Sequence, residues 1–180
     1  MSKKTNCELY DALSKRSTSR KYRGEEVDNE TLMKILWAGI GKNRAGEGRT
    51  APMPLGDIII KLYVASKDGV ALYDGDKDAL ETVLKNDIRD MIAHQDFVAK
   101  ASHIIIMTGL FENYRTNIRD QDRNDWTYAT AGTVLQNIYL SAAAHELGTA
   151  AIAWIKNEEI ERLLSLKNDE KPMFVSPLGK

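Results

Sequence analysis

The chain has 180 residues, with 25 Lys and Arg against 26 Asp and Glu, and a formal net charge of −1. This balance gives no electrostatic basis for binding nucleic acid or an acidic membrane surface. The length suits a single domain over residues 1–180 with a sizeable hydrophobic core. One cysteine, Cys7, excludes an internal disulfide framework and favours a reducing compartment. The first residues lack the apolar segment of a signal peptide, so we expect a cytoplasmic protein.

Residues 8–15 are predicted to form a short helix with Leu9, Ala12 and Leu13 facing inward. The chain then runs into Arg16-Ser17-Thr18-Ser19-Arg20-Lys21-Tyr22. Two arginines four residues apart, with hydroxyl groups between them, suit a phosphate, because guanidinium groups clamp phosphate oxygens in a fork. The alternative interpretation is a solvated basic turn between helices.

A second helix is predicted after a capping residue, Asp28 or Asn29, because an apolar periodicity follows at residues 32–37. A long loop comes next, over residues 39–56. Loops of this length inside a compact domain are usually functional or disordered. Its segment Arg49-Thr50-Ala51-Pro52-Met53-Pro54 is stiffened by two prolines, so we interpret it as a fixed wall of a site.

The middle of the chain predicts a β-hairpin, with a strand at 57–65, a turn, and a partner strand at 70–73. The aspartate-rich segment 74–78 resembles the start of a calcium loop, but it lacks the glycine and the glutamate that such a loop needs at its sixth and twelfth positions. We therefore interpret it as a turn that caps a helix over 79–85. Residues 86–100 are also predicted to be helical.

The central element of the second half is a helix over residues 128–147. It contains no proline and carries apolar groups on nearly every face, which is typical of a buried helix. Polar side chains such as Gln136 and Glu146 argue against a membrane span. Gly148 is the expected helix terminator, and 150–154 the expected buried strand after it. The helix must be covered by the rest of the domain or by a second subunit.

Four further elements complete the prediction. The β-branched run at 102–108 predicts a central strand. The polar segment 111–126 is expected to be a mobile helix or lid. A short helix capped by its first residue is predicted at 157–166, and a last strand at 172–175.

Side chains that could carry out catalysis on their own are few. The chain has no Gly-x-Ser-x-Gly motif and no phosphate-binding P-loop. Its three histidines, His94, His103 and His145, lack metal-ligand spacing, so a zinc site is disfavoured and no metal is expected. No pair of carboxylates stands out for acid–base work. A phosphate clamp and a stiff loop, with few catalytic groups, fit a protein that uses the chemistry of a cofactor.

Four stretches, in order, resemble the FMN-dependent nitroreductase family. Residues 16–22 are similar to its Arg-x-Ser/Thr-x-Arg/Lys-x-aromatic element. Asn43-Arg44 followed by Arg49-Thr50-Ala51-Pro52 resembles the Asn-Arg and Arg-Thr-Ala-Pro loop of one branch. Gln95-x-Phe97-Val98 before a strand, and the segment 135–142 on the central helix, match that branch too. The order and spacing agree over nearly the whole chain.

The resemblance implies an α+β fold with a mostly antiparallel central sheet flanked by helices. It implies a homodimer that holds two FMN molecules at the subunit interface, with the long helix at that interface. The implied activity is ping-pong electron transfer from NADH or NADPH, through FMN, to a nitro compound, a quinone or a similar small acceptor. Catalysis would then need no catalytic side chain. Two alternatives are a flavin-binding or flavin-handling protein without turnover, and a structural dimer that binds no flavin.

By this resemblance the N-terminal motif holds the FMN phosphate and reaches toward the pyrimidine edge, while its serine lies near the ribityl chain. The proline-containing loop lines the flavin, and a glutamine lies near the ring or the ribityl chain. Backbone N–H groups after the central helix approach flavin N5, and the last lysine is a candidate phosphate contact. The implied positions are Arg16, Ser17, Thr18, Arg20, Ala51, Pro52, Met53, Gln95, Ala153, Trp154 and Lys180.

The sequence departs from the family pattern at several places. Met53 stands where the branch usually has serine, and Gly56 where asparagine is common. Glu146 replaces a glycine that often precedes Leu-Gly. Many relatives carry a further C-terminal arm that wraps the partner subunit, whereas this sequence ends at Lys180.

Overall fold

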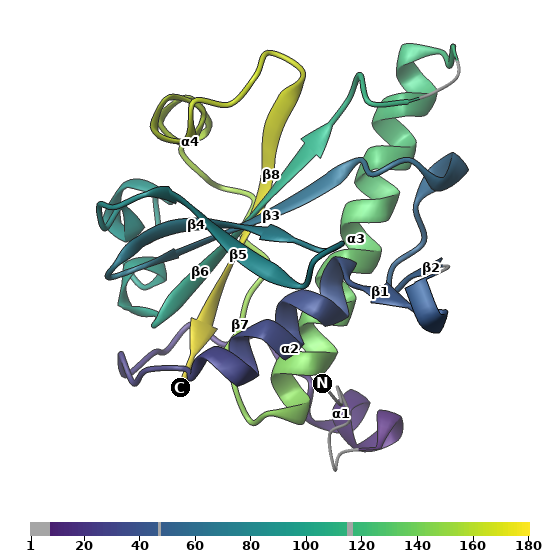
Figure 1. The fold of residues 1–180 in the computed structure, drawn as a ribbon. Helices are drawn as coiled ribbons and strands as arrows, with labels where there is room; N and C mark the ends of the chain where they lie inside the picture. The colour runs from purple at the N-terminus through teal and green to yellow at the C-terminus, as the bar shows by residue number, and fades with distance from the viewer. Residues whose placement is uncertain (1–7, 47, 115–116) are drawn as a thin grey trace.

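The protein is described by a computed structural model that covers residues 8–46, 48–114 and 117–180. At its centre is a six-stranded sheet with the order β5-β4-β3-β6-β8-β7 (Figure 1), in which every neighbouring pair is antiparallel. The strands are β3 (Ile60–Ser66), β4 (Gly69–Asp74), β5 (Ala79–Leu84), β6 (His103–Leu110), β7 (Gly148–Thr149) and β8 (Glu170–Gly179). A separate two-stranded ribbon consists of β1 (Lys42–Asn43) and β2 (Gly48–Arg49).

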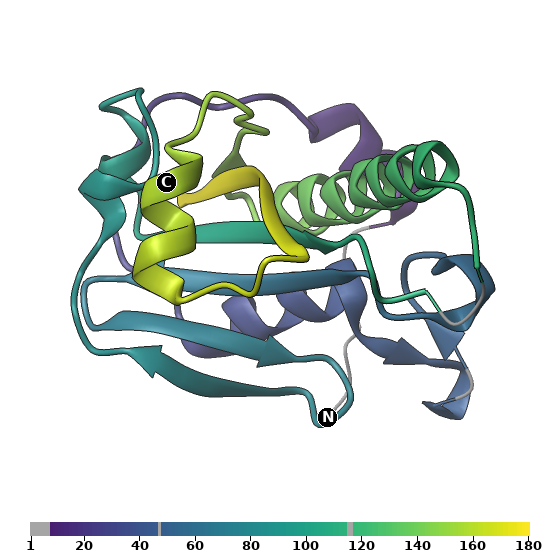
Figure 2. The same ribbon diagram turned by 90° about the horizontal axis from the view of Figure 1, so that it is seen from above.

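The described residues form four α-helices: α1 (Leu9–Lys15), α2 (Asn29–Ile40), α3 (Asp120–Ala144) and α4 (Asn157–Leu164). Helices α2 and α3 pack on one face, where their apolar side chains form a core with alternate residues of β3 and β6. Helix α4 and the segment before β6 cover the other face with a second core. In Figure 2, α4 crosses in front of the strands and α2 lies behind them. The α+β class and the mostly antiparallel sheet agree with the prediction.

The central strand β6 follows directly from its composition. Ile104, Ile105 and Ile106 are all at most 1% exposed, because consecutive side chains of a strand point to opposite faces and both faces are covered. The predicted second helix and its cap are also confirmed, since Thr31 donates its backbone N–H to Asp28 Oδ1 at 2.9 Å. The predicted hairpin corresponds to β3 and β4, although β3 begins three residues later than expected.

The helix expected over residues 79–85 is wrong, because Ala79–Leu84 is strand β5. Alanine, leucine and glutamate favour a helix intrinsically, but pairing with β4 overrides that weak preference. The aspartate-rich turn before it caps no helix; Asp74 Oδ1 accepts the backbone N–H groups of Asp76 and Lys77, which closes the β4–β5 connection.

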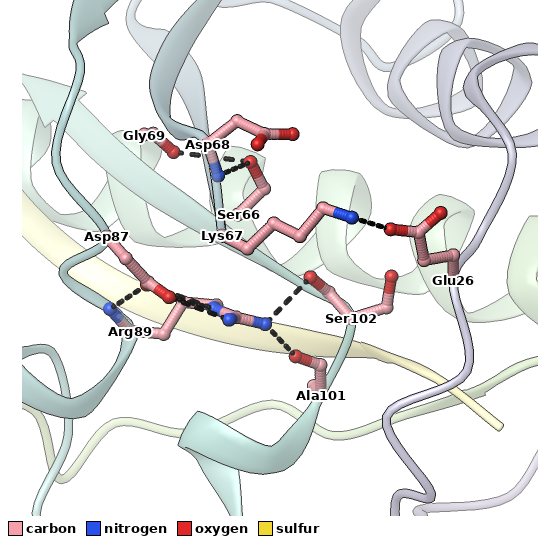
Figure 3. A network of polar contacts seen from close by, with 9 residues as sticks. All are labelled: Glu26, Ser66, Lys67, Asp68, Gly69, Asp87, Arg89, Ala101 and Ser102. Carbon is pink, nitrogen blue, oxygen red and sulfur yellow. Dashed lines mark hydrogen bonds and ion pairs between the residues drawn. The ribbon is translucent and has the colours of Figure 1, made fainter.

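The helix expected over 86–100 is also wrong, and Figure 3 shows one reason. Asp87 Oδ1 accepts the backbone N–H of Arg89 at 3.1 Å, and the Arg89 guanidinium bonds both carboxylate oxygens of Asp87 and the carbonyl oxygens of Ala101 and Ser102. These contacts favour a turn over a helix. The segment contains only two 3₁₀ turns, Arg89–Met91 and Val98–Lys100.

The central helix starts earlier and ends earlier than predicted. Its first two turns, from Asp120, lie in the segment expected to be a lid, of which residues 115–116 are outside the described part of the chain. Gly148 is not the terminator, because the helix ends at Ala144 and the left-handed position is taken by Glu146, with φ 57°. The side of α3 that includes Ala129, Thr133 and Gln136 remains exposed in the single chain.

The prediction for the segment after the central helix is also corrected. The strand expected at 150–154 is not a buried strand: Ile152 makes an isolated bridge to Val175, while Ala151, Ala153 and Trp154 are exposed.

In α1 only Ala12 is buried, whereas Leu9 and Leu13, expected inside, are exposed. Asn157 is the first residue of α4 and not its cap. Across the described residues, no helix combines the length and apolar character that crossing a bilayer would require.

Candidate functional site

The segment of the two predicted phosphate-binding arginines lies beside the short strand β7. Thr18 forms a parallel bridge with Thr149, and the Ser19 N–H donates to the Thr149 carbonyl at 2.9 Å. The Arg16 side chain follows the end of α1 and places its guanidinium carbon 5.5 Å from the ring centroid of Tyr139. Arg16 and Thr18, two of the predicted site residues, are therefore both in contact with Tyr139 of α3.

Tyr139 joins three separate parts of the chain. Its hydroxyl oxygen accepts the Ala151 N–H at 2.7 Å and lies 3.2 Å from Thr18 Oγ1, while its ring lies beneath Arg16. The residue is buried in α3. Sequence reasoning did not select Tyr139 as a site residue, although it lies in the family-like stretch 135–142. The signal was a hydroxyl-bearing ring within a mostly apolar helix, since a buried tyrosine hydroxyl usually has a partner.

The two arginines of this segment have no acidic partner in the described part of the chain. Neither Arg16 nor Arg20 lies within ion-pair distance of a carboxylate among the described residues, whereas Arg49 and Arg89 each pair with an aspartate. The segment is held by Tyr22, whose hydroxyl lies 2.8 Å from the Ser19 carbonyl oxygen. Burial raises the pKa of Tyr22 well above its usual range, so it stays neutral. Guanidinium groups held on an ordered segment without carboxylates suit an anion.

The loop predicted to be a fixed wall is held at several points. Arg49 donates from Nη1 to the Ile40 carbonyl at 2.8 Å and pairs with Asp76. Thr50 donates its N–H to the Gly41 carbonyl at 3.0 Å and accepts from Asn137 Nδ2 at 3.1 Å through its own carbonyl.

The next three residues of this loop are predicted to line the flavin. Ala51 is buried, Met53 is half-buried and Pro52 is exposed, so the loop presents Pro52 on a well-anchored backbone.

Among the described residues, this loop and the arginine segment contact different positions of α3. The loop is bonded to Asn137 of α3 and the arginine segment to Tyr139. Positions two apart on an α-helix point about 200° apart around its axis. The predicted site residues therefore fall into two groups on different sides of α3.

A third group of predicted residues comes together after α3. The bridge between Ala93 and Ile155 places Gln95 close to the segment of Ala153 and Trp154. The rings of His94 and Trp154 stack, with centroids 5.0 Å apart. Gln95 Oε1 is buried and has no hydrogen-bond partner in the described part of the chain. A buried, unpaired carbonyl oxygen is costly, so this atom is a candidate for contact with a bound group.

The last two predicted residues are placed as follows. Lys180 is exposed at the end of β8, and its carbonyl accepts the Arg23 N–H at 2.5 Å. This contact puts Lys180 near the end of the arginine segment. Ser17 is exposed within that segment. Among the described residues, no group of three histidine, cysteine, aspartate or glutamate side chains is arranged to hold a metal ion.

Comparison with known proteins gives the family. The sequence model of the Nitroreductase family matches residues 13–180. A candidate nitroreductase of Methanocaldococcus jannaschii is 27% identical over 183 residues, which cover 96% of this chain and 90% of that protein. The crystal structure of a candidate nitroreductase from Ralstonia eutropha is 30% identical in sequence and superposes with a TM-score of 0.89. The match covers 96% of this chain and 82% of the Ralstonia chain.

A more distant structure, from Bacteroides thetaiotaomicron, is described as a candidate NADH dehydrogenase/NAD(P)H nitroreductase. It is 19% identical in sequence and has a TM-score of 0.66, and the match covers 95% of this chain and 84% of the Bacteroides chain. At this identity the similarity shows the fold alone. The match over residues 13–180 covers both the sheet and the helices that carry the site. The chain therefore belongs to the nitroreductase family and is a nitroreductase-type oxidoreductase.

Proposed function

We propose that this protein is an FMN-dependent NAD(P)H oxidoreductase that reduces nitro compounds, quinones or similar small acceptors in a ping-pong reaction. The observation that carries the proposal is the pair of arginines, Arg16 and Arg20, which lack carboxylate partners among the described residues and lie on a segment fixed by Thr18 and Tyr139. An FMN phosphate supplies the anion that this segment suits. FMN would supply the hydride-accepting and electron-donating chemistry, which no side chain here provides.

The remaining groups fit a flavin as donors and acceptors. Gln95 Oε1, which is buried without a partner among the described residues, would accept a hydrogen bond from the flavin ring or the ribityl chain. The backbone N–H of Trp154 has no acceptor in the described residues and would donate toward flavin N5. Such a donor stabilises negative charge on the reduced ring. We propose Ser17 and Lys180 as further contacts of the ribityl–phosphate end.

A homodimer would bring the proline-containing loop of one subunit to the arginine segment of the other. The exposed side of α3 and the exposed leucines of α1, Leu9 and Leu13, offer apolar and small side chains to a second copy. Because Ala51, Pro52 and Met53 lie on the side of α3 away from Arg16, we propose that this loop lines the flavin held by the other subunit. Two FMN molecules would then bind between the subunits.

Two further expectations stay part of this proposal. We take residues 1–180 as one domain, because α3 contributes to the core on one face and its continuation reaches the other. The single cysteine, Cys7, which lies outside the described residues, supports a cytoplasmic location.

The test is an absorbance spectrum of the purified protein after FMN loading, followed by anaerobic addition of NADH or NADPH. Binding of FMN and then bleaching of its visible bands is the expected result. Bound FMN that stays oxidised with both donors would instead favour a flavin-binding protein without turnover. Failure to take up FMN would reject the cofactor assignment.

A further inference from the structure

A basic cavity of about 420 Å³ lies beside the loop that is proposed to face the flavin. Its lining includes Lys42, Arg44 and Arg49, together with Pro52 and Met53 of the loop itself. We infer that this cavity binds the anionic part of a redox substrate, either the phosphates of the nicotinamide donor or a carboxylate of the acceptor. The inference rests on the proposed function, because it places the charge of a substrate next to the flavin-lining residues.

The charges around this cavity are only partly neutralised. Lys42 and Arg49 share one carboxylate: Asp76 Oδ1 lies 3.2 Å from Lys42 Nζ and also pairs with Arg49 Nη2. Arg44 has no carboxylate within ion-pair distance in the described residues. Glu47, within the same loop, is outside the described part of the chain. Among the described residues that line this cavity, three carry a positive charge and none is acidic, so a negative group is attracted there.

The Arg44 side chain lies close to the backbone of Gly48, across the β1–β2 ribbon. A Cβ atom built on Gly48 would lie 1.7 Å from Arg44 Nη2 and 2.3 Å from its Cζ. The guanidinium therefore occupies the space that a Cβ at position 48 would fill, and glycine leaves this space open. Arg44 and Ala45 both have positive φ, of 46° and 56°. Unusual backbone of this kind in non-glycine residues clusters at active sites, ligand clamps and switch regions.

A second, apolar cavity shares two loop residues, Pro52 and Met53, with the basic one. It has a volume of about 440 Å³, and its lining includes Leu55, Trp126 and Thr133 in addition to Pro52 and Met53. A cationic space and an apolar one are thus both lined by this loop. This arrangement suits a ligand with a planar apolar ring and an anionic group joined to it, such as a nicotinamide dinucleotide or an anionic aromatic acceptor.

Calorimetry with two redox-inactive probes tests this assignment on the FMN-loaded, full-length protein. ADP-ribose carries the phosphates of the donor without its nicotinamide, and benzoate carries a carboxylate without a reducible group. We expect at least one probe to bind, and Arg44→Gln to weaken that binding about tenfold. Gly48→Ala, which keeps the charge but displaces the guanidinium, should weaken it in the same direction. Arg162→Gln removes one positive charge from α4, where Arg162 pairs with Glu159, and should leave it unchanged.

The two probes distinguish the sources of the anion. A loss confined to ADP-ribose assigns the cavity to the donor, and a loss confined to benzoate assigns it to the acceptor. The inference is overturned if neither probe binds, or if Arg44→Gln binds both as tightly as the unmodified protein does. Since neither probe exchanges electrons, and the titration can be repeated without FMN, this result is independent of whether bound flavin is reduced.

Discussion

The guanidinium of Arg16 lies over the ring of Tyr139, with 5.5 Å between Cζ and the ring centroid. A cation above an aromatic face is held by the ring quadrupole, so Arg16 is placed before any ligand arrives. The arginine comes from the end of α1 and the tyrosine from α3, 123 residues later in the chain. This contact makes the N-terminal segment part of a site built on the central helix.

Replacing Arg16 should weaken FMN binding while leaving riboflavin binding largely unchanged. Arg16→Ala removes a charge-assisted contact to phosphate, which contributes about 1.5–3 kcal/mol. Fluorescence titration with both flavins measures the difference. Arg119→Ala, at an exposed arginine paired with Asp122, is the control and should bind both normally. An Arg16→Ala protein with unchanged FMN affinity would reject the phosphate clamp.

Removing the Tyr139 hydroxyl should reduce both stability and FMN affinity. Tyr139→Phe keeps the ring beneath Arg16 but leaves the Ala151 N–H without its acceptor, at a cost of about 1–2 kcal/mol. Urea unfolding and FMN titration report the two effects. Tyr128→Phe on the exposed part of the same helix should change neither. If the two variants behave alike, Tyr139 does not organise the site.

Sequence reasoning reached the arginine segment but missed the tyrosine for a physical reason. Arg16 and Thr18 belong to a local pattern whose charge and hydroxyl groups can be read within seven residues. The role of Tyr139 depends on which residues fold against it, and its two hydroxyl contacts come from the N-terminal segment and from Ala151. Long-range contacts of this kind leave no local spacing in the sequence.

The same distinction explains the successes and errors in the fold. The isoleucine run of β6 and the Asp28 cap of α2 are local signals, and both were predicted correctly. Residues 79–84 have a helical composition but become a strand because β4 offers a partner. The segment 86–100 was predicted to be helical from its pattern, whereas the Asp87–Arg89 contacts fold it into turns.

Neutralising Glu170 should destabilise the protein substantially. This carboxylate is 2% exposed, and it accepts from Tyr63 at 2.9 Å, from Thr108 at 2.7 Å and from Lys61 at 2.6 Å. Removing one member of a buried ion pair typically costs 3–5 kcal/mol, but Lys61 is about a third exposed, so we expect roughly 2–3 kcal/mol for Glu170→Gln. Chemical denaturation provides the measurement.

The control for this change is Glu161→Gln. Glu161 pairs with Lys171 on the surface at 3.3 Å, and exposed pairs contribute about 0–1 kcal/mol. Equal losses in the two variants would show that the burial of Glu170 does not determine its contribution.

His103 should make stability fall in mildly acidic solution. Burial, and then the nearby Arg89 charge, lower the pKa of His103 below its usual value in the folded protein. The unfolded chain therefore binds a proton more readily than the folded one. The contribution of His103 to the free energy of unfolding is fully present above its pKa in the unfolded chain, about 6.5. This contribution is lost as the pH falls toward the lower pKa of the folded protein.

Urea midpoints at pH 7.5 and 5.5 measure this dependence. His103→Asn should show a smaller difference between the two pH values than the unmodified protein. His94→Gln, at an exposed histidine, should keep the full difference. An unchanged pH dependence in His103→Asn would assign the acid sensitivity to other groups.

Glycine at position 146 should stabilise the protein, and alanine at position 148 should destabilise it. Glu146 has φ 57°, where a residue with a Cβ atom is strained by about 1 kcal/mol, and glycine is not. The greater freedom of glycine in the unfolded chain offsets part of this gain, so we expect roughly 0.5 kcal/mol for Glu146→Gly.

Gly148 has ordinary φ, but a Cβ there would lie 2.6 Å from the Cβ of Ser19, against the arginine segment. Gly148→Ala should therefore lower the unfolding midpoint and weaken FMN binding together, whereas Glu146→Gly should raise the midpoint alone. If Gly148→Ala loses stability and keeps its FMN affinity, the position of the arginine segment against β7 does not control the site.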